Sequence, residues 1–174
     1  MLLENDRLCY GRDELLGMIV YHARQIDTNP TLQNMMNQYK RELDILRVGD
    51  SLNDKLRIPK KYKSQIRQVL KYCTKPELEM LLIISEDKIK DYEKFKSKKS
   101  PKSYCKENVR HNGHKYDNTS DFYREYYGDR IELLTDSINE YKRIKGKHKI
   151  DELYLADLLK KKDSVNYLSS ITDI

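Results

Sequence analysis

The feature that most constrains the fold is an apolar stripe at helical spacing in the C-terminal third of the chain. From Tyr123 to Tyr141, apolar side chains recur at steps of 4, 4, 3, 4 and 3 residues, which is typical of an amphipathic, coiled-coil-like helix. Glycine (6) and proline (4) are scarce among the 174 residues, whereas Lys, Glu, Leu and Ile are abundant. Because this composition favours helices over turn-rich sheets, the sequence predicts an all-α fold.

Further stretches with helical periodicity complete a predicted bundle of six or seven helices. Asn29 has the residue type of a helix N-cap, as do Thr119 and Ser120, either of which could cap the next helix, and Pro30 suits a first helical position. The segment from Met80 to Ile84 is apolar on every side, so we expect its helix at the centre of the bundle. The other predicted helices cover residues 13–26, 30–47, 60–73, 76–92 and 150–159, with one or two further turns after residue 164.

One segment breaks the helical pattern and suggests how the chain is organised. Residues 94–116 hold eight Lys or Arg, one Glu and no apolar periodicity, which indicates a long, exposed, basic connector. The sequence therefore predicts an N-terminal helical unit at 1–96, the connector at 97–117 and a C-terminal helical hairpin at 118–174. One continuous domain is the alternative.

Several classes of protein are excluded by what the sequence lacks. The start carries Glu4, Asp6 and Arg7, and no apolar run reaches 18 residues, so we expect neither a signal peptide nor a membrane span. The three cysteines have no CxxC spacing and indicate reduced thiols in a soluble, cytoplasmic protein. Motifs for nucleotide, dinucleotide, esterase or zincin chemistry are missing, which predicts a non-enzymatic protein without a cofactor or metal.

The net charge of +6 hides a strong segregation of charge. Three blocks, residues 55–75, 94–116 and 142–149, carry +20 together, and the rest of the chain carries −14. Basic blocks of this kind bind phosphate backbones, because each neutralised phosphate releases counterions. Within the predicted helix 60–73, Lys63, Arg67 and Lys71 recur every four residues. On a helix this spacing advances about 6 Å per step, so the three side chains could follow a phosphate backbone.

These observations predict a nucleic-acid-associated protein, with DNA and RNA both open as partners. Fourteen tyrosines against two phenylalanines add a possible recognition surface around residues 122–127, although the same residues could simply fill the core. The simpler explanation of the Lys and Tyr bias is an A+T-rich genome, as in low-GC bacteria, their phages or mobile elements. The candidate contact residues are Lys60, Lys63, Arg67, Lys71, Lys98, Lys99, Lys102, Lys106, Arg110 and Tyr126.

Two alternatives use the same features differently. In the first, the protein is an inhibitor or adaptor that docks its basic face on an acidic surface of a larger, nucleic-acid-handling protein. In the second, His111, His114 and Asp117 form a metal-dependent nuclease site, which requires their segment to be helical so that residues three apart become neighbours. Gly113 within this segment disfavours that helix. The oligomeric state is left open by the sequence.

Overall fold

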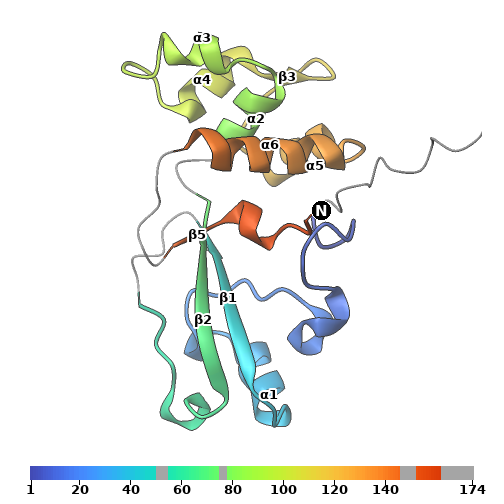
Figure 1. Ribbon diagram of the computed structural model, residues 1–174, viewed down its shortest axis with the longest axis vertical. Helices are drawn as coiled ribbons and strands as arrows, with labels where there is room; N and C mark the ends of the chain where they lie inside the picture. Colours follow the sequence, from blue (N-terminus) through green and yellow to red (C-terminus); the bar gives the residue numbers. More distant parts are fainter. Residues whose placement is uncertain (50–54, 75–77, 146–151, 162–174) are drawn as a thin grey trace, which may run out of the picture.

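The computed structural model of the chain describes residues 1–49, 55–74, 78–145 and 152–161. Within this part the protein mixes helices with strands: six α-helices accompany a three-stranded parallel sheet and a two-stranded antiparallel pair (Figure 1). The prediction of an all-α helical bundle is therefore wrong. None of the described helices combines the length and the apolar character needed to cross a membrane.

The parallel sheet is formed by segments that the periodicity assigned to helices. Its strands are β1 (Leu43–Gly49), β2 (Ile66–Cys73) and β5 (Leu153–Tyr154), in the order β1-β2-β5. β2 lies within the predicted helix 60–73, of which only the 3-10 turn Lys60–Tyr62 is helical. Strand β2 holds Ile, Val and Tyr, which suit a pleated strand, and its pairing with β1 supplies the hydrogen bonds that a helix would otherwise make.

The N-terminal part contains less helix than expected. The predicted helix 13–26 is replaced by short 3-10 turns at Arg12–Glu14, Leu16–Met18 and Ile26–Thr28. Helix α1 (Pro30–Gln38) begins as predicted, with the Asn29 side chain accepting a hydrogen bond from the Leu32 amide at 2.9 Å and Pro30 at the first position. It ends at Gln38 instead of residue 47, because the second half of the predicted helix forms strand β1 from Leu43 onward.

The remaining elements form a helical part at one end of the molecule (Figure 1). Helix α2 lies at its centre, and Leu82 and Ile83 are completely buried, which confirms the expected central position of this segment. Helix α2 packs against α4 on one side and α6 on the other. The elements are α2 (Glu79–Ser85), α3 (Ile89–Glu93), α4 (Pro101–Asn108), β3 (Arg110–His111), β4 (His114–Lys115), α5 (Ser120–Tyr127) and α6 (Ile131–Ile144).

The predicted connector is a folded layer rather than an open loop. Ser100 accepts a hydrogen bond from the Ser103 amide and caps α4, with Pro101 at its first position. Tyr104, Cys105 and Val109 are at most 1% exposed and belong to the main hydrophobic core. These few apolar residues anchor an otherwise basic segment, and they are too few to form a recognisable apolar stripe in the sequence. The expectation that this segment is an open, exposed loop is therefore wrong, whereas the division of the chain into two units stays a prediction.

The C-terminal elements also differ from the single long helix expected there. Thr119 caps α5 through its side chain, as predicted, but the stripe from Tyr123 to Tyr141 is divided between α5 and α6. The division falls at Gly128, where an added Cβ would lie 2.7 Å from the Arg124 carbonyl oxygen. Beyond residue 152 the chain forms β5 and the 3-10 turn Leu155–Leu158 instead of a helix. The turns expected after residue 164 lie outside the described residues.

Two hydrophobic clusters hold these parts together. The larger cluster lies among α2 to α6, and Met1, Leu2 and Leu8 from the N-terminus pack against it. The smaller cluster, Ile26, Met36 and Tyr62, joins α1 to the start of strands β1 and β2. Figure 1 shows the strand pair β1–β2 extending away from the helical part, with α1 beside its far end. The molecule therefore presents two separate ends to solvent.

Candidate functional site

The predicted contact residues fall at the two ends of the molecule. Lys60 and Lys63 lie in and after the 3-10 turn at the start of β2, and Arg67 and Lys71 lie on β2 itself. The others, apart from Tyr126, lie between α3 and the β3–β4 pair. In Figure 1 the start of β2 and helices α3 and α4 are at opposite ends of the long axis. The basic blocks at 55–75 and 94–116 consequently do not converge on one surface.

The four-residue stripe on β2 has a different geometry from the one expected. On a strand that rises about 3.3 Å per residue, Arg67 and Lys71 are about 13 Å apart instead of 6 Å. Arg67 is also engaged by Asp44 of β1, to which it donates two hydrogen bonds of 2.8 and 2.5 Å. This contact lowers the pKa of Asp44 and raises that of Arg67. The arginine therefore stabilises the β1–β2 pair.

The other end carries a basic surface, which we call the outer layer and define as residues 88–115. It comprises α3, α4 and the β3–β4 pair and contains ten Lys or Arg against three acidic residues. Each acidic residue is paired inside the layer: Asp91 with Lys94 at 3.4 Å, Glu93 with Lys96, and Glu107 with Lys99. Five basic residues are exposed and make no ion pair within the described part of the chain: Lys90, Lys98, Lys106, Arg110 and Lys115.

The outer layer is held in shape by a buried tyrosine. Tyr104 of α4 is 1% exposed, and its hydroxyl donates a 2.6 Å hydrogen bond to Asp91 of α3. The rings of Tyr104 and Tyr92 meet edge to face at 5.2 Å. Burial and the neighbouring Asp91 raise the pKa of Tyr104, so its hydroxyl stays a donor even at alkaline pH. The two short helices are thus fixed relative to one another before any partner binds.

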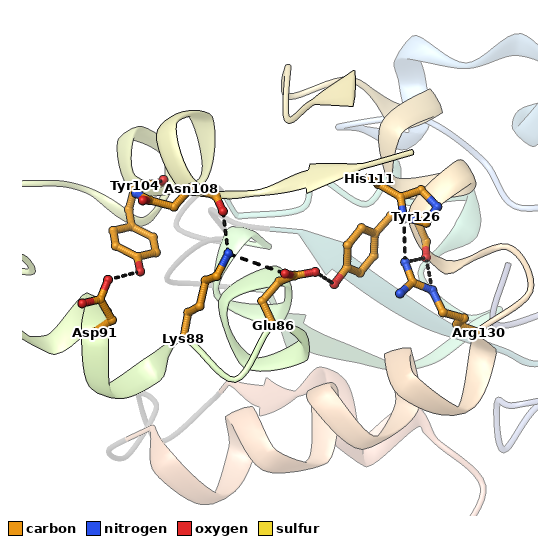
Figure 2. A network of polar contacts seen from close by, with 8 residues as sticks. All are labelled: Glu86, Lys88, Asp91, Tyr104, Asn108, His111, Tyr126 and Arg130. Carbon is orange, nitrogen blue, oxygen red and sulfur yellow. Dashed lines mark hydrogen bonds and ion pairs between the residues drawn. The ribbon is translucent and has the colours of Figure 1, made fainter. Parts of the chain in front are cut away.

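A second set of polar contacts ties the outer layer to the helices beneath it (Figure 2). Lys88 donates a 2.6 Å hydrogen bond to the Asn108 carbonyl at the end of α4 and lies 3.6 Å from the Glu86 carboxylate. Glu86 in turn accepts a 2.5 Å hydrogen bond from the Tyr126 hydroxyl of α5. One continuous series of contacts therefore links the C-terminal ends of α2, α4 and α5.

Tyr126 positions Arg130, which is not among the predicted contact residues. The Arg130 guanidinium lies 4.2 Å from the centre of the Tyr126 ring, and its Nε donates a 2.8 Å hydrogen bond to the Tyr126 carbonyl. A terminal nitrogen of Arg130 lies 3.2 Å from Nδ1 of His111 (Figure 2). Because a guanidinium only donates, His111 accepts through Nδ1. No motif marks this arrangement, since it joins residues from β3, α5 and the start of α6.

The burial of Tyr126 bears on its candidate role. Only 1% of this residue is exposed, and burial together with the Glu86 contact raises its pKa. Phe122 and Tyr127 are also buried, at 5% and 1% exposed, so most of the aromatic cluster at 122–127 fills the core. Tyr126 is therefore too buried to contact a partner itself, and its role is to hold the side chains of Arg130, His111 and Glu86.

His111 and His114 come together on a hairpin rather than on a helix. They are opposed residues of the β3–β4 pair, and Gly113 in the turn between them has a φ of 81°, which favours glycine. Within the described residues, no three His, Cys, Asp or Glu side chains gather as a metal site would require. The geometry therefore gives no support to the nuclease alternative.

A small cavity lies where the sheet meets the helices. Its volume is about 20 Å³, and it is lined mainly by apolar parts of Cys73, Leu81, Ile138 and Tyr141. A space of this size holds about one water molecule. It is too small for an organic ligand, so the outer layer is the better candidate for function.

Comparison with known proteins does not favour any one of these functions. No family model, no curated protein and no solved structure matches the chain.

Proposed function

We propose that the protein is a non-enzymatic, cytoplasmic, nucleic-acid-associated protein that binds phosphate backbones with its outer layer. One observation carries the proposal: the three acidic residues of the layer are neutralised within it, which leaves Lys90, Lys98, Lys106, Arg110 and Lys115 exposed without an ion-pair partner among the described residues. Such a surface attracts polyanions irrespective of sequence.

The ordered backbone of the outer layer supports the proposal. A flexible connector would lose conformational freedom on binding, and that loss would offset much of the electrostatic gain. The Tyr104–Asp91 and Lys88–Asn108 contacts already fix α3 and α4 in the free protein. The basic side chains still have to order, but the backbone that presents them does not.

The test is the salt dependence of binding, measured by fluorescence anisotropy with a labelled 20-nucleotide strand and a labelled 20-base-pair duplex. Five phosphate contacts should give a slope of log affinity against log salt of about −3.5 on the single strand and −4.5 on the duplex. Affinity that does not change between 50 and 300 mM salt would rule out a phosphate-based site.

Charge reversal then locates the site. The variant Lys98→Glu/Lys106→Glu/Arg110→Glu should lose binding at least about tenfold at 100 mM salt, because three contacts become repulsive. Its matched control is Lys55→Glu/Lys60→Glu/Lys63→Glu, which changes the net charge equally at the opposite end of the molecule. We expect a much smaller loss from the control. Equal losses in both variants would assign binding to net charge and would overturn the outer layer as the site.

A second function, a protein-binding adaptor or inhibitor, is favoured by a different observation. Met18, Ile19 and Val20 are consecutive and are 59%, 46% and 60% exposed, an unusual run of apolar side chains for a basic, polar chain. Pull-down from nuclease-treated lysate tests this alternative. Capture that survives nuclease and is lost in Ile19→Ser/Val20→Ser would favour it, whereas capture that disappears with nuclease would favour nucleic acid.

A further inference from the structure

Phe95 is an exposed aromatic side chain inside the outer layer. It lies between α3 and α4 and is 38% exposed, although the other phenylalanine of the chain, Phe122, is buried. The main chain around it is folded: the Phe95 amide donates to the Tyr92 carbonyl at 2.8 Å, and the Phe95 carbonyl accepts from the Lys98 and Lys99 amides at 2.8 and 2.9 Å. The ring is thus presented from an ordered turn.

Two neighbours fix the environment of the ring. Tyr104, which is buried, lies 6.4 Å away between ring centres at an angle of 36°, so Phe95 rests on the core at one side. The Lys99 ammonium lies 5.5 Å from the centre of the Phe95 ring and is paired with Glu107. Lys94, Lys96 and Lys98 are all exposed and flank the ring in sequence. An exposed apolar face therefore stands beside one ammonium group, in a segment rich in exposed lysines.

We propose that Phe95 stacks on a base of a single-stranded nucleic acid whose phosphates the outer layer binds. This inference rests on the function proposed above and specifies its ligand. Lysines alone neutralise phosphates on duplex and single strand alike, but an exposed aromatic ring finds a partner only where base faces are accessible. A duplex keeps those faces stacked inside, so the combination of ring and charges selects single strands.

The contact with Lys99 does not prevent stacking. A cation beside an exposed ring contributes less than a stacked base does, so a base can displace the ammonium from the ring. Lys99 remains next to the site through its ion pair with Glu107, where it can meet a phosphate. The ligand can therefore replace the Lys99 contact on the exposed part of the ring.

The experiment compares four labelled probes of equal phosphate number per strand: (dT)20, (rU)20, a 20-mer in which every base is replaced by an abasic spacer, and a 20-base-pair duplex. The native protein should bind (dT)20 or (rU)20 more tightly than the abasic strand and, per strand, more tightly than the duplex. The stronger of the first two identifies DNA or RNA as the preferred single strand.

Variants of the aromatic residues isolate the stacking contact. Phe95→Ala should weaken binding to the preferred single strand by about 5- to 150-fold and leave the abasic strand unchanged. Phe95→Tyr keeps the ring face and should bind like the native protein, whereas Phe95→Leu keeps apolar volume and should bind like Phe95→Ala. The matched control is Tyr39→Ala, because Tyr39 is 37% exposed but lies at the end of α1, far from the outer layer. This variant should bind normally.

The outcomes separate this inference from the function on which it rests. Salt-sensitive binding of all probes that is equal for the abasic and normal strands, or that Phe95→Ala leaves unchanged, would overturn base stacking and retain phosphate binding. The absence of binding to every probe would remove the proposed function itself. Circular dichroism and thermal melting of each variant show whether its fold is intact, and the Leu variant preserves the test if the Ala variant unfolds.

Discussion

The guanidinium of Arg130 rests on the ring of Tyr126 at 4.2 Å while the hydroxyl of the same tyrosine is held by Glu86 at 2.5 Å. One buried side chain thus joins two charges of opposite sign, one through its ring and one through its oxygen. The ring and the hydroxyl can be removed separately, so their contributions to stability can be measured.

Replacing Tyr126 with Phe removes only the hydrogen bond to Glu86, and we expect the free energy of unfolding to fall by about 1 kcal/mol, because the Glu86 carboxylate is partly accessible to water. Tyr126→Leu also removes the ring beneath Arg130 and should cost about 2–4 kcal/mol. Urea denaturation measures both. Equal losses in the two variants would show that the ring contact with Arg130 contributes nothing.

The ion pair between Arg67 and Asp44 predicts an acid dependence. Hydrogen bonds from Arg67 and then Gln68 lower the pKa of Asp44, so the folded protein holds this carboxylate ionised more strongly than the unfolded chain does. The resulting stability is present above a pH of about 4 and is lost as the pH falls through the lowered pKa. Asp44→Asn should therefore show a shallower decline of the urea midpoint between pH 5 and pH 2. Parallel curves for the two proteins would contradict this assignment.

Local signals in the sequence predicted local structure well. The caps at Asn29 and Thr119, Pro30 at the start of α1 and the central position of residues 80–84 all depend on a few neighbouring residues, and the structure confirms them. The strands were missed because a four-residue spacing places side chains on one face of a helix and equally on one face of a strand. The stripe at Lys63, Arg67 and Lys71 could not distinguish the two.

What decides between helix and strand here is pairing between distant segments. β2 pairs with β1 across the segment between them and with β5 at Tyr72 and Leu153, 81 positions apart. No window of ten or twenty residues contains that information. The candidate site also combines local and long-range features. The basic composition of residues 94–116 is evident from the sequence. The burial of Tyr104, the pairing of the three acidic residues and the contacts of Arg130 depend on how the elements pack together.

Buried and partly buried tyrosines predict an alkaline limit of stability. Burial is the largest cause of a raised pKa in Tyr104, Tyr116, Tyr123, Tyr126, Tyr127 and Tyr141. Above the ordinary tyrosine pKa near 10, the unfolded chain releases protons that the folded protein retains, so the free energy of unfolding decreases as the pH rises. Each such group steepens this decrease by up to about 1.4 kcal/mol per pH unit.

The measurement follows urea midpoints between pH 8 and pH 11.5 together with tyrosinate absorbance. We expect most of the absorbance change to coincide with unfolding, and Tyr104→Phe to give a shallower decrease because one titrating hydroxyl is removed. Tyrosinate that appears fully in the folded protein would show that these hydroxyls are open to solvent.

Gly128, at the break between α5 and α6, leads to a prediction about stability. Gly128 has helical backbone angles, with φ −50° and ψ −55°, so glycine is not required there by its conformation. An added Cβ would instead lie 2.7 Å from the Arg124 carbonyl oxygen, a backbone atom that moves only with α5. Gly128→Ala should therefore destabilise the protein by about 1–3 kcal/mol, although alanine is the better helix former. Gly113→Ala is the matched comparison, because a Cβ there meets nothing within 4 Å and the cost comes from its positive φ alone. Urea denaturation of both variants measures the difference, and a Gly128→Ala protein as stable as the native one would show that α5 accommodates the methyl group by a small shift.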